Sequence, residues 1–76
     1  MNHYTTTDMA LAATLMTLSI EIVSIERDWT KATFHFKNTE RLKELLRNYF
    51  NNKIMVNPIT FFWNIKWLKT RIYQDF

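Results

Sequence analysis

The last stretch of the chain, residues 58–76, has the apolar spacing of a helix with two different faces. At about 100° per residue, its main apolar stripe covers roughly 140° of the helix and is expected to face the core. That stripe consists of Phe61, Phe62, Ile65, Leu68, Ile72, Tyr73 and Phe76. Trp63 and Trp67 fall nearly opposite it, one turn apart. Their neighbours on that side are Lys66, Thr70, Arg71 and Gln74.

Residues 8–18 predict a second helix that is apolar almost all round. The run Thr5-Thr6-Thr7-Asp8 is a helix start signal, in which a threonine accepts a free N–H and Asp8 lies at the positive end of the dipole. The apolar positions that follow are Met9, Leu11, Ala12, Ala13, Leu15, Met16 and Leu18, with Ala10, Thr14 and Thr17 on the other side. A helix with so wide an apolar arc is expected to be central and covered, with the last helix as its neighbour.

Two strands are predicted over residues 20–27 and 31–37, joined by Asp28-Trp29-Thr30 as a β-hairpin. The second strand alternates cleanly: Ala32, Phe34 and Phe36 are expected inside, and Thr33, His35 and Lys37 outside. The first strand changes phase, because Ile20 and Ile22 share one face while Val23 and Ile25 share the other. Either both faces are partly buried, or a β-bulge shifts the phase near Ile22.

A third helix is predicted over residues 39–51, capped by Asn38 or Thr39. Its apolar positions are Leu42, Leu45, Leu46, Tyr49 and Phe50, and its polar positions are Glu40, Lys43, Glu44 and Arg47. Asn51-Asn52 is expected to end it in the left-handed conformation that glycine usually takes. A short extended link then leads to Asn57, which caps the last helix at Pro58.

These elements predict one α+β domain over residues 1–76, with the order α-β-β-α-α. The β-hairpin is expected to pack against three helices, because an isolated two-stranded ribbon is only marginally stable in water. A short extended piece at His3–Thr5 or at Ile54–Val56 is a candidate edge strand.

Three stretches together resemble a known family. They are Thr6-Thr7-Asp8 with Leu11-Ala12-Ala13, the hairpin ending in Phe34-x-Phe36, and Leu68-Lys69-x-x-Ile72-Tyr73. The chain is similar to a family of small uncharacterised proteins, a domain of unknown function seen in bacterial, archaeal and phage-type genomes. That family usually has a glycine after the first helix, where this chain has Leu18-Ser19. The resemblance implies a fold and transfers no site, and Trp63 and Trp67 lie outside its motifs.

Composition excludes several classes of site. The chain has no glycine and no cysteine, so it has no Gly-rich phosphate loop, no Gly-x-Ser-x-Gly elbow and no disulfide. The surplus of Phe, Tyr, Met, Ile, Asn and Lys over Gly, Ala, Arg and Pro is typical of AT-rich coding, as in many bacteria and phages. No positively charged segment precedes the apolar run at Met9–Leu18, which is also too short to span a bilayer. We therefore expect a cytoplasmic protein, in a bacterium or in the host if phage-encoded, without a membrane partner.

No catalytic or metal site is expected. His35 is predicted on the outward face of its strand and His3 in the tail, and two histidines without a third ligand make a weak metal site. Glu21 and Glu26 differ in parity along their strand, so they are not expected to act as a pair. Neither Ser19 nor Ser24 has a suitably placed histidine, and no nucleophile, base and orienting group can be assembled. The sequence therefore predicts a non-enzymatic protein without cofactor or small-molecule substrate.

The tryptophan side of the last helix is the candidate binding site. Trp63, Trp67 and Arg71 advance by four residues, so they form a ladder, with Lys66 and Thr70 beside it. Three explanations are open: another element of the same chain covers this side, it forms a protein interface that includes homodimers, or it binds nucleic acid. Aromatic rings stack on bases, and Trp and Arg are enriched at the centres of protein interfaces.

The formal charge of +3 is concentrated in residues 39–76. The cations there are Arg41, Lys43, Arg47, Lys53, Lys66, Lys69 and Arg71. A charge of this size is ordinary for a small domain, so a solvated surface is favoured over a phosphate-binding one. The leading hypothesis is a small interaction protein that meets itself or another protein through Trp63 and Trp67. The alternatives are a small nucleic-acid-binding protein that uses the same side, and an inhibitor of a host or rival protein encoded by a mobile element.

Overall fold

The computed structural model describes residues 3–28 and 30–74. Its elements follow the order β-α-β-β-α-α, with three strands and three helices in the described residues. They are β1 (His3–Thr6), α1 (Met9–Thr17), β2 (Ile22–Arg27), β3 (Ala32–Lys37), α2 (Glu40–Phe50) and α3 (Pro58–Gln74). The predicted α+β class is confirmed. The predicted order lacked β1, which forms at the first of the two candidate edge positions, whereas residues 54–56 form no strand.

The strands form one antiparallel sheet in the order β1-β3-β2. Phe36 on the central strand β3 lies opposite Tyr4 on one side and Ile22 on the other, and Phe34 lies opposite Ile25. The register shifts between Ile22 and Ser24, so the bulge considered from the sequence is confirmed. Phe34 and Phe36 are fully buried on the face of the sheet that the helices cover, as predicted.

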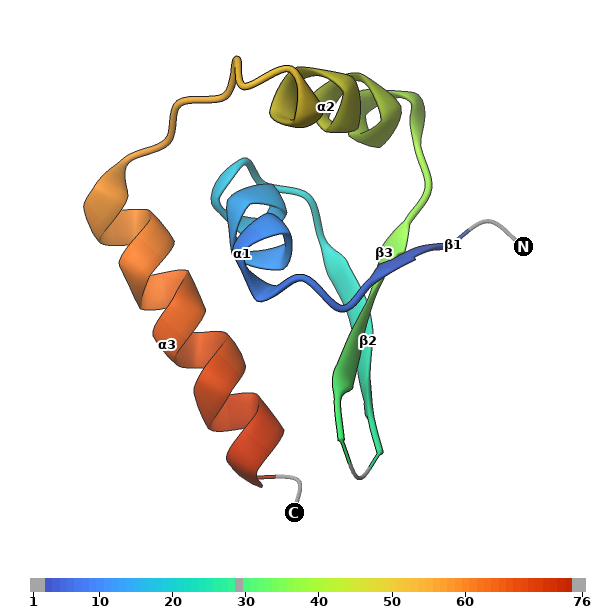
Figure 1. The fold of residues 1–76 in the computed structure, drawn as a ribbon, viewed down its shortest axis with the longest axis vertical. Helices are drawn as coiled ribbons and strands as arrows, with labels where there is room; N and C mark the ends of the chain where they lie inside the picture. The colour runs from blue at the N-terminus through green and yellow to red at the C-terminus, as the bar shows by residue number, and fades with distance from the viewer. Residues whose placement is uncertain (1–2, 29, 75–76) are drawn as a thin grey trace.

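Helix α1 lies in the middle of the fold. Figure 1 shows α3 along one side of it, α2 across one end and the sheet on the other side. Its residues 11–15 are all buried, and they include Thr14, which had been predicted on the open side. Thr14 tolerates burial because its Oγ1 donates to the carbonyl oxygen of Ala10 at 2.8 Å. The predicted central position of α1 is confirmed.

Side chains with hydrogen-bonding groups begin each helix. Asp8 caps α1 by accepting from the backbone N–H groups of Ala10 and Leu11, so the expectation that a threonine fills this role is wrong. The hydroxyl of Thr6 instead accepts from the N–H of Asp8. Thr39 caps α2. The amide oxygen of Asn57 accepts from residues 59 and 60 at the start of α3, as predicted.

Helices α1 and α2 both end in a Schellman motif without glycine. Ser19 and Asn52 take the left-handed conformation, with φ of 69° and 60°. After α1, the N–H of Ile20 donates to the carbonyl of residue 15, and that of Ser19 to residue 16. The same pair of bonds follows α2, from residues 53 and 52 to residues 48 and 49. Serine and asparagine thus take the left-handed position, usually filled by glycine, at the ends of these two helices.

The molecule is thin, with principal extents of 34 × 33 × 18 Å. Its core is correspondingly narrow and is built on α1, Phe34, Phe36, Leu42, Leu68 and Ile72. None of the three described helices has the length and hydrophobicity that a bilayer-spanning segment requires.

Candidate functional site

Helix α3 packs against α1 with one face only, which we call the inner face and which consists of Phe61, Asn64, Ile65, Leu68 and Ile72. Leu68 is completely buried. Asn64 also lies on this face, where its side-chain amide donates to the hydroxyl of Thr17 at 2.9 Å. At the other end of α3, the Arg27 guanidinium donates to the carbonyl oxygen of Ile72, which ties the helix to the hairpin.

The predicted apolar stripe of α3 was too wide. Phe62 and Tyr73 had been assigned to the core, but both are exposed. Phe62 lies about 100° from the middle of the inner face, beyond the reach of α1. Tyr73 lies near the end of the helix, where the Arg27 guanidinium covers its ring at 5.9 Å. Phe76, the last member of the predicted stripe, is outside the described residues.

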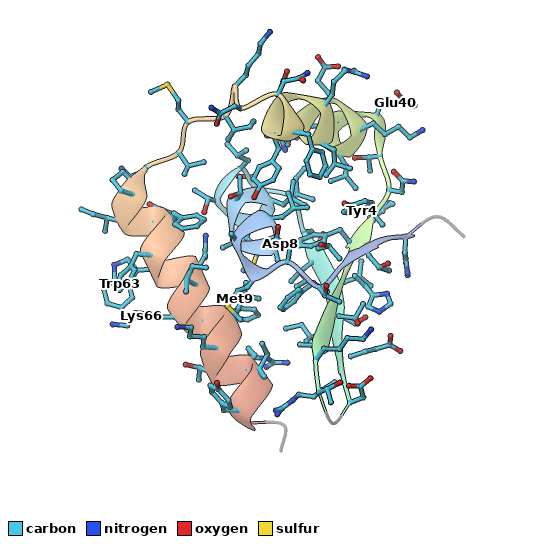
Figure 2. The ribbon with its side chains drawn as sticks, in the orientation of Figure 1. Tyr4, Asp8, Met9, Glu40, Trp63 and Lys66 are labelled. Carbon is cyan, nitrogen blue, oxygen red and sulfur yellow. The ribbon has the colours of Figure 1, made fainter. Side chains whose placement is uncertain are left out.

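The opposite side of α3 carries an unusually apolar exposed surface. We call it the outer face and define it as Ile59, Phe62, Trp63, Lys66, Trp67, Thr70 and Arg71. The exposed fractions of its four large apolar side chains are 67% for Ile59, 57% for Phe62, 61% for Trp63 and 44% for Trp67. Figure 2 shows Trp63 and Lys66 pointing away from the body of the molecule, whereas Met9 lies between α1 and α3. Both indoles are exposed and neither belongs to the core cluster, so internal burial does not account for them.

Cationic groups lie over the aromatic rings of the outer face, and the distances below are measured to the ring centroids. The Lys66 Nζ lies 5.0 Å from the Trp63 ring and 5.3 Å from the Phe62 ring. The guanidinium of Arg71 lies 5.5 Å from the Trp67 ring. The Thr70 hydroxyl donates back to the carbonyl of residue 66 at 2.9 Å. All five residues predicted for the site, Trp63, Lys66, Trp67, Thr70 and Arg71, are therefore exposed on one side of α3.

Two members of the outer face were missed by the sequence reasoning. Ile59 and Phe62 extend the apolar spacing to i, i+3, i+4 and i+8, which is the pattern of a helix that packs against another element. The signal was present in the sequence, but Phe62 had been assigned to the core. Met55, in the link before α3, is almost fully exposed and adds a further apolar side chain next to this helix.

The cations of residues 39–76, for which a solvated surface was favoured over a phosphate-binding one, do not form one surface of free cations. On α2, Lys43 pairs with Glu40 at 3.4 Å and Arg47 pairs with Glu44 at 2.8 Å. Arg41 donates to the carbonyl of Leu18 at 2.7 Å and so holds α2 to the end of α1. The cations of α2 are therefore occupied locally, and those of α3 lie on a different element.

His35 was predicted to be a surface histidine, but its side chain contacts two other residues of the sheet. Its Nε2 lies 2.7 Å from an oxygen of Glu26 on the neighbouring strand, and its side chain is mostly covered. The ring of His3 meets it edge-on at 6.2 Å between centroids. Among the residues that the structure describes, no group of three or more His, Cys, Asp or Glu side chains is arranged to hold a metal ion.

A hollow of about 540 Å³ lies between α1, the end of α2 and the start of α3. Its lining includes Tyr49, Ile54, Val56 and Phe61, and it is mostly apolar. Burial, and to a lesser extent the charge of Asp8, raises the pKa of the Tyr49 phenol. A phenol with a raised pKa stays protonated at physiological pH, so the Tyr49 hydroxyl remains a hydrogen-bond donor in this hollow.

The family model described as "Domain of unknown function (DUF5659)" matches residues 1–74. The chain belongs to the DUF5659 family. No curated protein and no solved structure matches it. The motifs that carried the resemblance are largely structural in this DUF5659 chain: Asp8 caps α1, and Phe34, Phe36, Leu68 and Ile72 form the core. The outer face of α3 lies outside those motifs, so a function must be argued from that surface itself.

Proposed function

We propose that this protein is a small non-enzymatic interaction protein that binds a protein partner through the outer face of α3. The observation that carries the proposal is the exposure of Trp63 and Trp67 on a helix whose opposite face already packs the core. Monomeric proteins rarely leave contiguous apolar surface open, and surfaces of this kind mark interaction sites. Trp is also among the residues most enriched at interface hot spots.

The geometry of the outer face favours a partner that lies along α3. Ile59, Phe62, Trp63 and Trp67 follow helical spacing over about two turns, so they present a continuous ridge. The ridge is mounted on a helix that is anchored to α1 by Leu68 and Asn64. A pre-ordered surface pays less entropy on binding than a flexible one, which favours its use in recognition.

Nucleic acid is the second candidate, because Trp63 and Trp67 are rings on which bases could stack beside Lys66, Lys69 and Arg71. Two observations make it weaker. Lys66 and Arg71 already lie over the indole rings, and the cations of α2 are engaged locally. A single helix with three cations also offers few phosphate contacts, whereas electrostatic contacts supply most non-specific binding to nucleic acid.

We place this interaction in the cytoplasm, of a bacterium or of a host cell if the gene is phage-encoded. The absence of cysteine supports this compartment, because reducing compartments favour proteins without disulfides. A second copy of the chain is one form of partner. A host or rival protein that this chain inhibits, as an element encoded by a phage or another mobile element, is another.

Site-specific photo-crosslinking in the producing cell tests the proposal. A benzophenone amino acid is placed at Thr70, within the outer face, or at Ser24, an exposed position on β2, as the matched control. We expect irradiation to give a discrete protein adduct from position 70 and none of the same mass from position 24. An adduct of twice the chain mass identifies a second copy, and a nuclease-sensitive adduct identifies nucleic acid. Identical adducts at both positions, or none at position 70, would contradict the proposal.

A further inference from the structure

A cation lies inside the apolar ridge rather than at its border. At about 100° per residue, Lys66 lies within roughly 40° of the mid-line of Ile59, Phe62, Trp63 and Trp67. Its ammonium group contacts the rings of Phe62 and Trp63 at 5.3 and 5.0 Å, so it sits between two of the apolar side chains that would be covered on docking. Any partner that covers the ridge therefore also covers Lys66.

Covering this ammonium group requires a counter-charge. A buried charge is costly unless it is paired and hydrogen-bonded. Within the described residues, Lys66 forms no ion pair, and the sequence of α3 contains no Asp or Glu. The two flanking rings provide cation–π attraction, but they accept no hydrogen bond of the strength that a carboxylate accepts. The missing carboxylate must come from whatever docks on the outer face.

We infer that the outer face of α3 takes an acidic amphipathic helix of another protein, with a carboxylate of that helix on Lys66 and apolar side chains on Phe62, Trp63 and Trp67. This inference rests on the proposed function and specifies its partner. The ridge from Ile59 to Trp67 is about 12 Å long at 1.5 Å per residue, which matches about two turns of a partner helix. Arg71 at the edge of the face adds a second position for an acidic side chain.

A second copy of this chain fits the outer face less well. A two-fold arrangement of α3 against α3, centred between Trp63 and Trp67, would bring Lys66 of both copies together, and α3 has no carboxylate to separate them. If α3 docked on a different surface of a second copy, the contact would be head-to-tail. Repeating such a contact gives either a closed ring or an open filament, not a dimer. Charge complementarity therefore favours a different, acidic chain.

An anionic lipid surface also fits less well. On helices that lie in a membrane interface, Lys and Arg occupy the polar face and reach to the headgroups, while the apolar face enters the acyl region. Here Lys66 lies within the apolar ridge, flanked by Phe62 and Trp63. If the ridge entered the acyl region of a membrane, the Lys66 ammonium group would enter it too.

The test uses two labelled synthetic peptides of about 18 residues, long enough to form a helix. Both have leucines at helical spacing i, i+3, i+4 and i+7, and the remaining positions carry glutamate in one peptide and lysine in the other. Fluorescence anisotropy with the full chain is expected to show at least about tenfold tighter binding of the acidic peptide. Lys66→Glu is expected to reverse that order. Lys37→Glu on β3 changes the net charge equally and is expected to leave the order unchanged.

Three outcomes would overturn the inference. Equal affinity for the two peptides, or no binding of either, would remove the acidic helix as the occupant. Tighter binding of phosphatidylglycerol vesicles or of an oligothymidylate than of the acidic peptide would assign the face to lipid or nucleic acid. Sedimentation of a dimer that is lost in the Trp63→Ala, Trp67→Ala variant would assign it to a second copy. In each case, the photo-crosslinked adduct from position 70 tests the proposed function separately, because it shows whether the outer face binds any protein.

Discussion

Replacing Leu68 by alanine is expected to lower the free energy of unfolding by about 2–5 kcal/mol. Leu68 is completely buried at the centre of the inner face of α3, and its loss leaves a cavity against α1. A chain of 76 residues buries a small core, so this change removes a large share of its total stability. Urea denaturation followed by far-ultraviolet circular dichroism measures the effect.

Trp63→Ala is the matched control for Leu68→Ala, because it removes a larger apolar side chain from the opposite face of the same helix. We expect it to change the free energy of unfolding by no more than about 0.5 kcal/mol, as for other exposed positions. Alanine also favours the helix more than tryptophan does. If Trp63→Ala destabilises the chain as strongly as Leu68→Ala, the indole belongs to the core and the outer face is not free.

The variant Trp63→Ala, Trp67→Ala is expected to weaken partner binding by at least about 100-fold while leaving the fold intact. Truncation of one interface hot spot typically costs about 2 kcal/mol or more, which is roughly 30-fold in affinity. The two indoles lie one turn apart and contact neighbouring parts of the partner. The losses of binding free energy from the two substitutions are therefore not expected to add fully. The affinity for the acidic peptide and the yield of the adduct from position 70 both report the change.

Phe50→Ala is the control for the tryptophan variant. Phe50 is as exposed as the indoles but lies at the end of α2, where its ring meets Tyr49 edge-on at 5.3 Å. Its removal lowers the total exposed aromatic surface without touching α3, and we expect binding to stay within about twofold of the wild type. An equal loss of binding in Phe50→Ala would show non-specific aromatic adhesion rather than docking on α3.

Most of the fold was predictable because its signals are local. Asn57-Pro58 marks the start of α3, Thr39 caps α2, and the alternation through Phe34 and Phe36 defines β3. Strand β1 carries little signal of its own, because His3–Thr6 is short and mostly polar. It becomes a strand by pairing with β3, and only Tyr4 of its four residues packs against the core.

The errors on α3 and α2 have one physical cause. The periodicity of a helix gives the direction of each side chain but not the width of the surface that its neighbour can cover. In this thin molecule α1 covers a narrow strip of α3, so Phe62 and Tyr73 stay outside it. Phe50 was assigned to the covered side of α2 and is exposed for the same reason.

The position of the candidate site was predictable from the sequence, but its exposure to solvent was not. The sequence placed Trp63, Trp67, Lys66, Thr70 and Arg71 on one side of a helix, and that placement follows from spacing alone. Whether another element covered them depended on where α2 lies. Helix α2 crosses the end of α1 rather than the free side of α3, which leaves the outer face open (Figure 1).

Solvent paramagnetic relaxation of the Trp63 and Trp67 indole N–H groups tests the central claim, that the outer face of α3 is a docking surface. The wild-type chain is measured alone and with saturating acidic peptide, and the signals are assigned with the two single alanine variants. We predict strong relaxation of both indoles in the free monomer and strong protection of both in the complex. Indoles that are already as protected in the free monomer as the amide of Leu68, or that stay equally relaxed when peptide is bound, would contradict the claim.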